Sequence, residues 1–275
     1  MGLWGGAKRR VMERADRAGK RALLRGLALA TRDVTARVAT TSCVVLAPHP
    51  DDETLGCGAL IARKTSAGAA VWVAFASLGT DSHRSRHLTS QQLGEIRRAE
   101  AREACRRLGV AEERVLFLSE VDRIATAAAP IAAALGALLD TARPDELYVV
   151  SGLDEHPDHA ALNAIVTDRL ASGAIACPVY EYPVWFWADR QAARRWLAGV
   201  GRTIAKVRDA RGGYLAPVAV STDGFLAQKR RALAAHATQV TRYRTDEPWS
   251  TLQDIDDSRW LERFFGPHEL FFPRG

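Results

Sequence analysis

The sequence predicts an α/β fold with a Rossmann-like, mostly parallel sheet that is covered by helices on both faces. Short apolar runs alternate with longer segments of helical periodicity, and the connections between them are short, which is typical of a buried parallel sheet. The chain has 275 residues, of which 47% are hydrophobic and 25% are charged. This length and composition suit one sizeable core rather than two equal domains.

Five short apolar runs, rich in β-branched and aromatic residues, predict the strands of this sheet. They lie at residues 44–47, 71–77, 115–118, 147–150 and 179–182. Longer segments between them predict the covering helices, because their composition and spacing are helical. These segments lie at residues 53–67, 93–108, 125–141 and 160–171. Gly109, directly after the second helix, suits the left-handed residue that commonly ends a helix.

The regular alternation ends after the last of these strands. Several aromatic side chains crowd between Tyr180 and Trp187. They pack in the core or between two copies of the chain, or they form a wall of a substrate cleft or touch a membrane. Beyond them a strand is expected near 218–222 and a helix over 224–238. Residues 248–275 are expected to form an irregular, aromatic-rich end.

Residues 1–40 carry most of the positive charge and are predicted to form a basic helical arm, separate from a domain over 41–275. The arm holds ten Lys/Arg and three acidic residues, a charge of +7, whereas the whole chain has +6, so the domain is nearly neutral. A nucleic-acid partner is therefore not expected. Residues 7–38 are predicted to form one helix, or two that are broken near Gly26. This helical segment either packs outside the domain or contacts an anionic lipid surface or a partner.

Cysteine usage and hydropathy favour a cytoplasmic protein, with membrane-peripheral contact through the arm as the alternative. The four cysteines are widely spaced and form no CxxC motif, so we expect buried thiols in a reducing compartment and no thiolate zinc site. No apolar run approaches the roughly 20 residues of a membrane span. Residues 22–30 resemble the apolar part of a signal peptide, but Arg25 interrupts them.

Two clusters of histidine and carboxylate residues follow two of the predicted strands. His49-Pro50-Asp51-Asp52-Glu53 follows the first strand, and His156-Pro157-Asp158-His159 follows the fourth. One such cluster is typical of a helix cap or a turn. Two of them at the carboxyl ends of parallel strands are expected at one edge of the sheet, where open α/β sheets bind their ligands. The pair therefore predicts an active site.

The first cluster and the last residue of the second suit a zinc-dependent hydrolase. Catalytic zinc is commonly held by three imidazole or carboxylate ligands, with one open position for water. His49 and Asp52 can face one point from a strand end, and His159 can supply the third ligand. Asp51 is then free to act as the general base toward a water whose pKa the metal lowers to about 7.

The remaining residues of the second cluster can act on the substrate amide. His156 is expected to hydrogen-bond the developing oxyanion or to protonate the leaving amine. Asp158 lies close enough in sequence to orient an imidazole. Together with the metal and the base, these groups would complete a cycle of amide hydrolysis.

At these residues the chain resembles the PIG-L/LmbE family of zinc-dependent N-deacetylases. The resemblance rests on APHPDDETLGCGA (Ala47–Ala59) and HPDH (His156–His159). The segments Leu93–Gly109 and Lys229–Gln239 also look like elements of that family, so the resemblance covers roughly 43–240 and leaves the basic arm outside. It implies a Rossmann-like fold and removal of an acetyl group from an N-acetylglucosamine-type sugar in a larger conjugate.

Carried onto the matching positions, the resemblance implies the same roles as the residues themselves. It makes the metal ligands His49, Asp52 and His159, the general base Asp51, and the electrophile or acid His156. Zinc is the expected metal, with another divalent ion as the alternative. One departure concerns a Tyr that family members acting on inositol-linked glucosamine can carry just before the second cluster. Leu153-Asp154-Glu155 stands there in this chain.

Four further residues are candidates for substrate contact: Arg97, Asp81, Arg84 and Asp122. The alternative for Arg97 is a solvated ion-pair face shared with Glu100, and the alternative for the other three is turn chemistry. His236 is interpreted as a packed or capping histidine rather than as a ligand.

Two other functions stay open on the sequence alone. One is an amide hydrolase that uses the same zinc site on a thiol or peptide conjugate. The other is a metal-binding module without hydrolytic activity, although Asp51 would then have no use. A nucleotide-binding enzyme is not favoured, because no GxGxxG motif follows the first strand. An oligomer is compatible with the sequence.

Overall fold

The computed structural model describes residues 31–82, 85–188, 217–243 and 245–274, and within them one sheet of eight strands. The strand order is β1-β7-β8-β6-β5-β2-β3-β4. The strands are β1 (Arg32–Asp33), β2 (Cys43–Ala47), β3 (Val71–Phe75), β4 (Val115–Phe117), β5 (Glu146–Val150), β6 (Val179–Tyr182), β7 (Val218–Ser221) and β8 (His268–Pro273). The predicted α/β fold with a mostly parallel sheet is confirmed.

The five expected strands, β2 to β6, form a continuous parallel half of the sheet. β2 lies at its centre, in parallel register with β3 on one side and β5 on the other. All five residues of β2 are fully buried, because the faces of a parallel sheet are both covered. The carboxyl ends of β2 and β5, which the two His/Asp clusters follow, therefore lie side by side at one edge.

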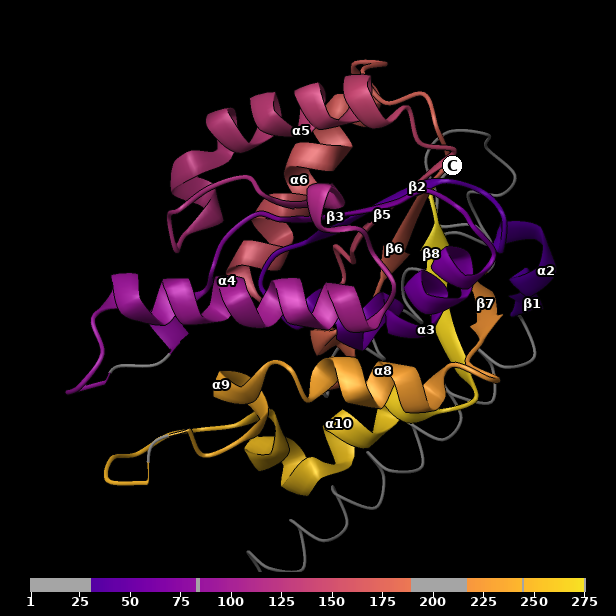
Figure 1. Cartoon of the computed structure of the whole chain (residues 1–275). Coiled ribbons are helices and arrows are strands. Elements are labelled where there is room, and N and C mark those ends of the chain that lie inside the picture. The colour runs from indigo at the N-terminus through magenta and orange to yellow at the C-terminus, as the bar shows by residue number, and fades with distance from the viewer. Residues whose placement is uncertain (1–30, 83–84, 189–216, 244, 275) are drawn as a thin grey trace, which may run out of the picture.

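Helices cover both faces of this half (Figure 1). The helices of the described residues are α2 (Thr35–Val38), α3 (Asp52–Ser66), α4 (Ser90–Arg107), α5 (Ala128–Ala142), α6 (Pro157–Ala171), α8 (Leu226–Leu233), α9 (Ala237–Val240) and α10 (Arg259–Glu262). Figure 1 shows α5 and α6 on one face and α3 and α4 on the other, with α8 packed against α3 and α4. Short 3-10 turns are η1 (Thr80–Ser82), η2 (Glu112–Arg114), η3 (Ile124–Ala127), η4 (Trp185–Trp187), η5 (Leu252–Ser258) and η6 (Arg263–Phe265).

The C-terminal part is more regular than the sequence suggested. Within the stretch expected to be irregular, β8 inserts between β6 and β7 and runs antiparallel to both. Phe271 and Phe272 are buried, and so is the Glu269 carboxylate. The buried Phe271-Phe272 pair does not alternate with polar residues, so the period of two that marks a half-buried strand is absent.

The described end of the basic arm packs on the domain. Arg32–Asp33 pair in parallel with β7, and Val34 and Val38 are buried in the core, so the expected helix does not run through to residue 38. The rest of the predicted arm lies outside the described residues.

Among the described residues, one helix qualifies for a membrane span by length and composition, contrary to the expectation that no apolar run is long enough. It covers Ile124–Ala142, that is, η3 and α5 together. Its Ile131, Leu135 and Leu138 belong to the domain core. Core helices commonly pass the same test, so the apolar composition is weak evidence for a span.

Candidate active site

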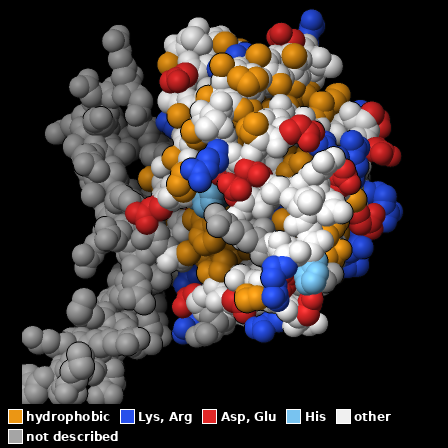
Figure 2. Space-filling model, turned by 90° about the vertical axis from the view of Figure 1, so that its left-hand side faces the viewer, with side chains coloured by type: hydrophobic (Ala, Val, Ile, Leu, Met, Phe, Trp, Pro, Cys, Tyr) orange, Lys and Arg blue, Asp and Glu red, His pale blue; other side chains and the backbone are white. Residues whose placement is uncertain are grey.

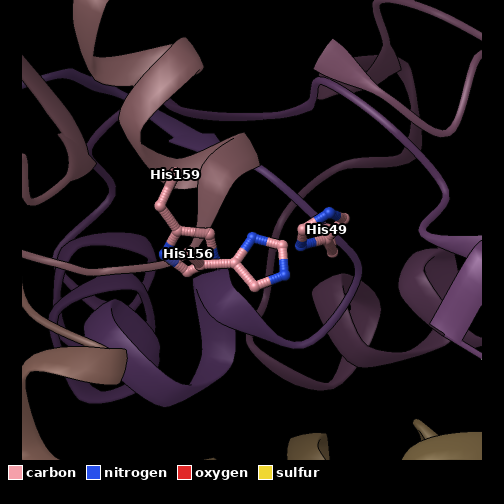
Figure 3. Close-up of side chains that lie close together, drawn as sticks. All are labelled: His49, His156 and His159. Carbon is pink, nitrogen blue, oxygen red and sulfur yellow. The ribbon is translucent and has the colours of Figure 1, made fainter. Parts of the chain in front are cut away.

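The two His/Asp clusters meet at the carboxyl edge of the sheet. His49 lies in the turn after β2, and His156 and His159 lie at the start of α6, which follows the neighbouring strand β5. Figure 3 shows the three imidazole rings close together, with His49 reaching them from the other loop. One ring nitrogen of each residue lies within 4.8 Å of those of the other two.

The carboxylate of Asp52 lies between two of these imidazoles. Its Oδ2 is 3.4 Å from His49 Nδ1 and 3.3 Å from His159 Nε2. His159 Nε2 is buried and has no hydrogen-bond partner among the described residues, whereas His159 Nδ1 lies 2.9 Å from Asp154 Oδ2. A carboxylate at Nδ1 holds the proton there and leaves the Nε2 lone pair for a cation. The three expected ligands therefore fit a divalent metal that takes nitrogen and oxygen ligands.

The charges around this point favour a cation. Burial disfavours a charged imidazole at His159, yet the Asp52 and Asp154 carboxylates raise its pKa to about 10. Burial likewise opposes ionisation of Asp52, but the His159 and His49 imidazoles lower the pKa of its carboxyl below the usual range. The negative charge that attracts a proton here would also stabilise a metal ion.

Asp154 behind His159 was not expected as a site residue. Its side chain is buried and also accepts hydrogen bonds from the backbone N–H groups of Val184, at 3.1 Å, and Phe186, at 2.7 Å. Residues 153–155, where related sequences can carry a Tyr, thus place the Asp154 carboxylate against His159, an expected metal ligand. Only its position five residues before His159 could have suggested this role.

Asp51, the expected base, has a strained backbone. Its φ is 116°, a region that residues with a side chain rarely adopt. Its N–H donates to Glu53 Oε2 at 2.9 Å, and the other oxygen of Glu53 lies 2.9 Å from His236 Nε2. Gln239 Nε2 donates to the Pro50 carbonyl at 2.7 Å. Buried side chains from the α8–α9 region therefore hold the turn in this conformation.

The surroundings of Asp51 suit a base. Burial, and next the negative charge of Asp52, raise the pKa of the Asp51 carboxyl well above its usual range. A carboxylate with a raised pKa accepts a proton more readily near neutral pH. The expected packing of His236 is confirmed, because the ring is fully buried, but its link to the Asp51 turn through Glu53 was not foreseen.

His156 is arranged as a neutral hydrogen-bond donor. It caps the N-terminus of α6, where its Nδ1 accepts from the Asp158 N–H at 3.3 Å, so the proton of the neutral ring lies on Nε2. Burial, and then the neighbouring His159 and His49, lower the pKa of His156 to about 4. The ring lies against Trp185, with centroids 6.1 Å apart.

Asp158 contacts the imidazole of His49 rather than that of His156. Its Oδ2 lies 3.3 Å from His49 Nε2, and its Oδ1 accepts from the Ile124 N–H at 2.9 Å. Asp158 therefore contacts an imidazole, as expected, but the ring is that of His49 in the first cluster.

The solvated ion-pair interpretation of Arg97 and Glu100 is wrong. Arg97 is only 1% exposed, and its guanidinium donates to the carbonyls of Leu78 and Gly79. Glu100 is buried and accepts from the Thr238 N–H at 2.8 Å. The burial of these two side chains could not be predicted from the sequence, because their hydrogen-bond partners lie on other elements.

The remaining candidates for substrate contact come from the loops after β3 and β4. The Asp122 carboxylate accepts from the N–H and the hydroxyl of Thr80, at 2.6 and 2.5 Å, which is turn chemistry. Asp81 is exposed and lies 3.7 Å from Arg123. Arg84 lies outside the described residues.

A cavity of about 620 Å³ connects these groups. Its lining includes His49, Asp51, Asp52, His156 and Asp158 from the clusters, Asp81, Arg97 and Asp122 from the candidate substrate contacts, and Val184, Trp185, Leu252, Ile255 and Trp260 from the C-terminal half. Pockets of about 300–1,000 Å³ commonly enclose small-molecule ligands. The aromatic cluster therefore contributes to this cavity as well as to the core.

Sequence comparison relates the chain to one family of deacetylases. The profile of the PIG-L family, described as GlcNAc-PI de-N-acetylase, matches residues 44–170. A 1D-myo-inositol 2-acetamido-2-deoxy-alpha-D-glucopyranoside deacetylase of Rhodococcus erythropolis is 32% identical over 70% of this chain and 79% of its own length. The enzyme of the same name from Mycolicibacterium paratuberculosis is 33% identical over 70% of this chain and 77% of its own.

Solved structures share the fold at lower identity. A deacetylase of the teicoplanin biosynthetic pathway, in a triple-mutant form, superposes with a TM-score of 0.62 and 18% identity, over 86% of this chain and 98% of its own. The N,N'-diacetylchitobiose deacetylase of Pyrococcus horikoshii gives a TM-score of 0.59 and 17% identity, over 85% and 83% of the two chains.

Proposed function

Because the chain belongs to the PIG-L family, we propose that it is a metal-dependent deacetylase that acts on an N-acetylglucosamine-type sugar within a larger conjugate. The observation that carries this proposal is the convergence of His49, Asp52 and His159 on one point, beside a cavity that His49, Asp51 and Asp52 line. The named activities of the relatives support the amino-sugar amide as the substrate.

His49, Asp52 and His159 would hold the metal, with zinc as the ion we propose. A bound metal of this kind supplies Lewis acidity toward the amide carbonyl and acidifies a water molecule. The two carboxylates that touch imidazoles, Asp154 on His159 and Asp158 on His49, would orient these ligands.

The residues of the chain then account for the proton transfers. Asp51 takes a proton from the attacking water as its oxygen bonds to the acetyl carbon. His156 keeps its proton and donates a hydrogen bond from Nε2–H to the carbonyl oxygen as negative charge develops there. When the C–N bond breaks, Asp51 gives the proton that it took from water to the leaving nitrogen. The products are acetate and a free amine.

Substitution of Asp51 tests the base. We expect Asp51→Asn to keep the metal and to lower acetate release from an N-acetylglucosaminyl conjugate by at least about 10²-fold, the usual size of a general-base contribution. Asp140→Asn, at the exposed end of α5, is the matched control and should change neither quantity. Full activity in Asp51→Asn would rule out Asp51 as the base.

A panel of substrates separates the proposal from its two alternatives. Amine release from thiol- or peptide-bearing amides, with none from acetylated sugars, would favour a different amide hydrolase. Bound zinc without amine release from any amide would favour the binding module.

We also propose a cytoplasmic location with membrane-surface contact through the basic arm. Since residues 32–38 pack on the domain, the arm is best tested by deletion of residues 1–30. Loss of activity on a lipid-presented substrate alone would support the contact, and equal activity on dispersed and lipid-presented substrate would exclude it.

A further inference from the structure

The cavity over the candidate active site has two chemically different sides. In the sheet, β2 and β5 lie between β6 on one side and β3 and β4 on the other. The loops after β3 and β4 bring Asp81, Asp122 and Arg123 to the cavity, whereas η4, after β6, brings Trp185. The side after β3 and β4 is thus mainly charged, with Ala125 beside it, and the side built by η4 and η5 is mainly apolar, with Ser250 and Thr251 beside Leu252.

The apolar side is built by two segments that pack on each other. Trp185 of η4 lies against Trp260 of α10, with ring centroids 5.2 Å apart, and Trp260 Nε1 donates to the Val184 carbonyl at 3.2 Å. Trp260 is only 1% exposed and serves as support for this wall. Leu252 and Ile255, on the adjoining η5, are half-buried and line the cavity.

Trp185 does not offer an open face for a sugar ring. His156 lies against it at 6.1 Å between centroids, and Trp260 stacks on it with an angle of 25° between the rings. Two neighbouring rings therefore cover part of Trp185, and Leu252 and Ile255 add apolar surface to the lining beside it. Aliphatic side chains of this kind contribute affinity only by removing apolar surface from water.

The surface of the molecule also has apolar and charged regions. Figure 2 shows hydrophobic side chains gathered in a hollow beside a histidine, with acidic and basic side chains around them. The polar side is strongly exposed, since 65% of the Asp81 side chain and 78% of the Arg123 side chain are accessible. Sugar hydroxyls suit such groups, whereas Leu252 and Ile255 have no hydrogen bond to offer them.

We propose that the wall formed by Trp185, Leu252 and Ile255 binds an apolar aglycone, so that the substrate is an amphiphilic glycoside rather than one with a polyhydroxylated aglycone. This inference rests on the proposed deacetylase function. The acetamido group must reach the metal-binding cluster at the cavity floor. Leu252 and Ile255 belong to η5, whereas the clusters lie at the starts of α3 and α6, so we assign this wall to the aglycone rather than to the acyl methyl group.

The first experiment compares three aglycones on the same sugar. Methyl, inositol and octyl glycosides of N-acetylglucosamine are assayed below the micellar range for amine release by the zinc-loaded enzyme. We expect kcat/KM for the octyl glycoside to exceed that for the other two by about tenfold or more, because a methylene in an apolar pocket is worth roughly that much. Equal values for the octyl and methyl glycosides would overturn the inference and leave the deacetylase proposal intact.

Matched serine variants locate the preference on η5. Leu252→Ser and Ile255→Ser should each lower the octyl-to-methyl ratio of kcat/KM by about tenfold. Gln253→Ser, on the same 3-10 turn but exposed and outside the cavity lining, should keep the ratio of the natural chain. An unchanged ratio in both Leu252→Ser and Ile255→Ser would place the apolar contact elsewhere and overturn the assignment of the wall.

A second substrate pair distinguishes the aglycone from the acyl group. N-acetyl and N-hexanoyl forms of the methyl glycoside are compared in the same assay. A preference for the hexanoyl form that Leu252→Ser removes would assign the wall to the acyl chain and contradict the aglycone. Absence of amine release from every glycoside would instead reject the deacetylase proposal itself.

Discussion

Asp51 combines a strained backbone with the role proposed for a base. Its φ of 116° persists because Glu53 accepts its N–H, while His236 and Gln239 hold Glu53 and Pro50 from the α8–α9 region. A backbone conformation of this kind costs on the order of 1–3 kcal/mol and survives only where the surroundings enforce it. The strained conformation therefore lowers the stability of the fold at Asp51, whose carboxylate lines the cavity.

Replacing Asp51 by Gly or Ala measures this strain. Both variants lose the carboxylate, but only Gly adopts a φ of 116° freely, so Asp51→Gly should be more stable than Asp51→Ala by about 1 kcal/mol after the entropy cost of glycine. Urea unfolding at matched m-values gives the difference. If Asp51→Ala were equally or more stable, the turn would not be strained.

At the level of residues, the sequence predicts groups that are close together along the chain. His49, Asp51 and Asp52 share one turn, and a strand end explains why they face one cavity. Glu53 lies in the same motif, yet its partner His236 is 183 positions away, and no local spacing could join them. Asp154 was not predicted for a similar reason, because its hydrogen bonds reach Val184 and Phe186 at the start of η4, some thirty positions away.

Helix α3 shows how an element depends on its neighbours. Its early Gly56-Cys57-Gly58 run is poor helix-forming sequence, but both glycines lie under large side chains. A Cβ at Gly56 would come within 2.2 Å of the Tyr182 ring, and one at Gly58 within 2.8 Å of Lys229 Cγ. Gly56 therefore lets the first turns of α3, which begin at Asp52, approach β6 closely, and Gly58 does the same toward α8.

The variant Gly56→Ala tests this close approach. Despite the better helix propensity of alanine, we expect the free energy of unfolding to fall by about 1–3 kcal/mol, because the Tyr182 ring must move and its hydroxyl donates to the Leu46 carbonyl at 2.9 Å. Part of the loss should disappear in combination with Tyr182→Leu, as a double-mutant cycle measures. Gly266→Ala is the control, since its nearest contact would be an ordinary 3.6 Å.

Helices and strands with a clear hydrophobic periodicity were predicted well, whereas β8, which lacks such a pattern, was not predicted. Strands β2 to β6 and helices α3 to α6 follow from apolar runs and helical spacing. β8 does not, because its identity comes from pairing with β6 and β7 rather than from its own pattern. α4 begins at Ser90, three residues before the expected start, because Thr89 and Gln92 form a capping box there.

For the whole molecule, a metal at the junction of β2 and β5 should stabilise the fold. Free zinc at about 100 times its Kd would add about 2.7 kcal/mol to the free energy of unfolding. Thermal unfolding with zinc, and again with a chelator, should show a rise in Tm that His159→Ala removes. His87→Ala is the control, because His87 is exposed and pairs with Asp246. An equal rise in Tm in His159→Ala would mean that zinc binds elsewhere.

The position of β8 has a consequence for biosynthesis. β6 ends at Tyr182, but β8, the strand that pairs with its second edge, begins at His268. This edge of β6 therefore stays unpaired while more than eighty further residues are translated. During that interval its unpaired backbone and the buried Glu181 are open to solvent and to other nascent chains. Pairing across such a sequence distance is slow. The yield of folded protein should therefore depend on protection of this edge on the ribosome, by chaperones or by the pace of translation.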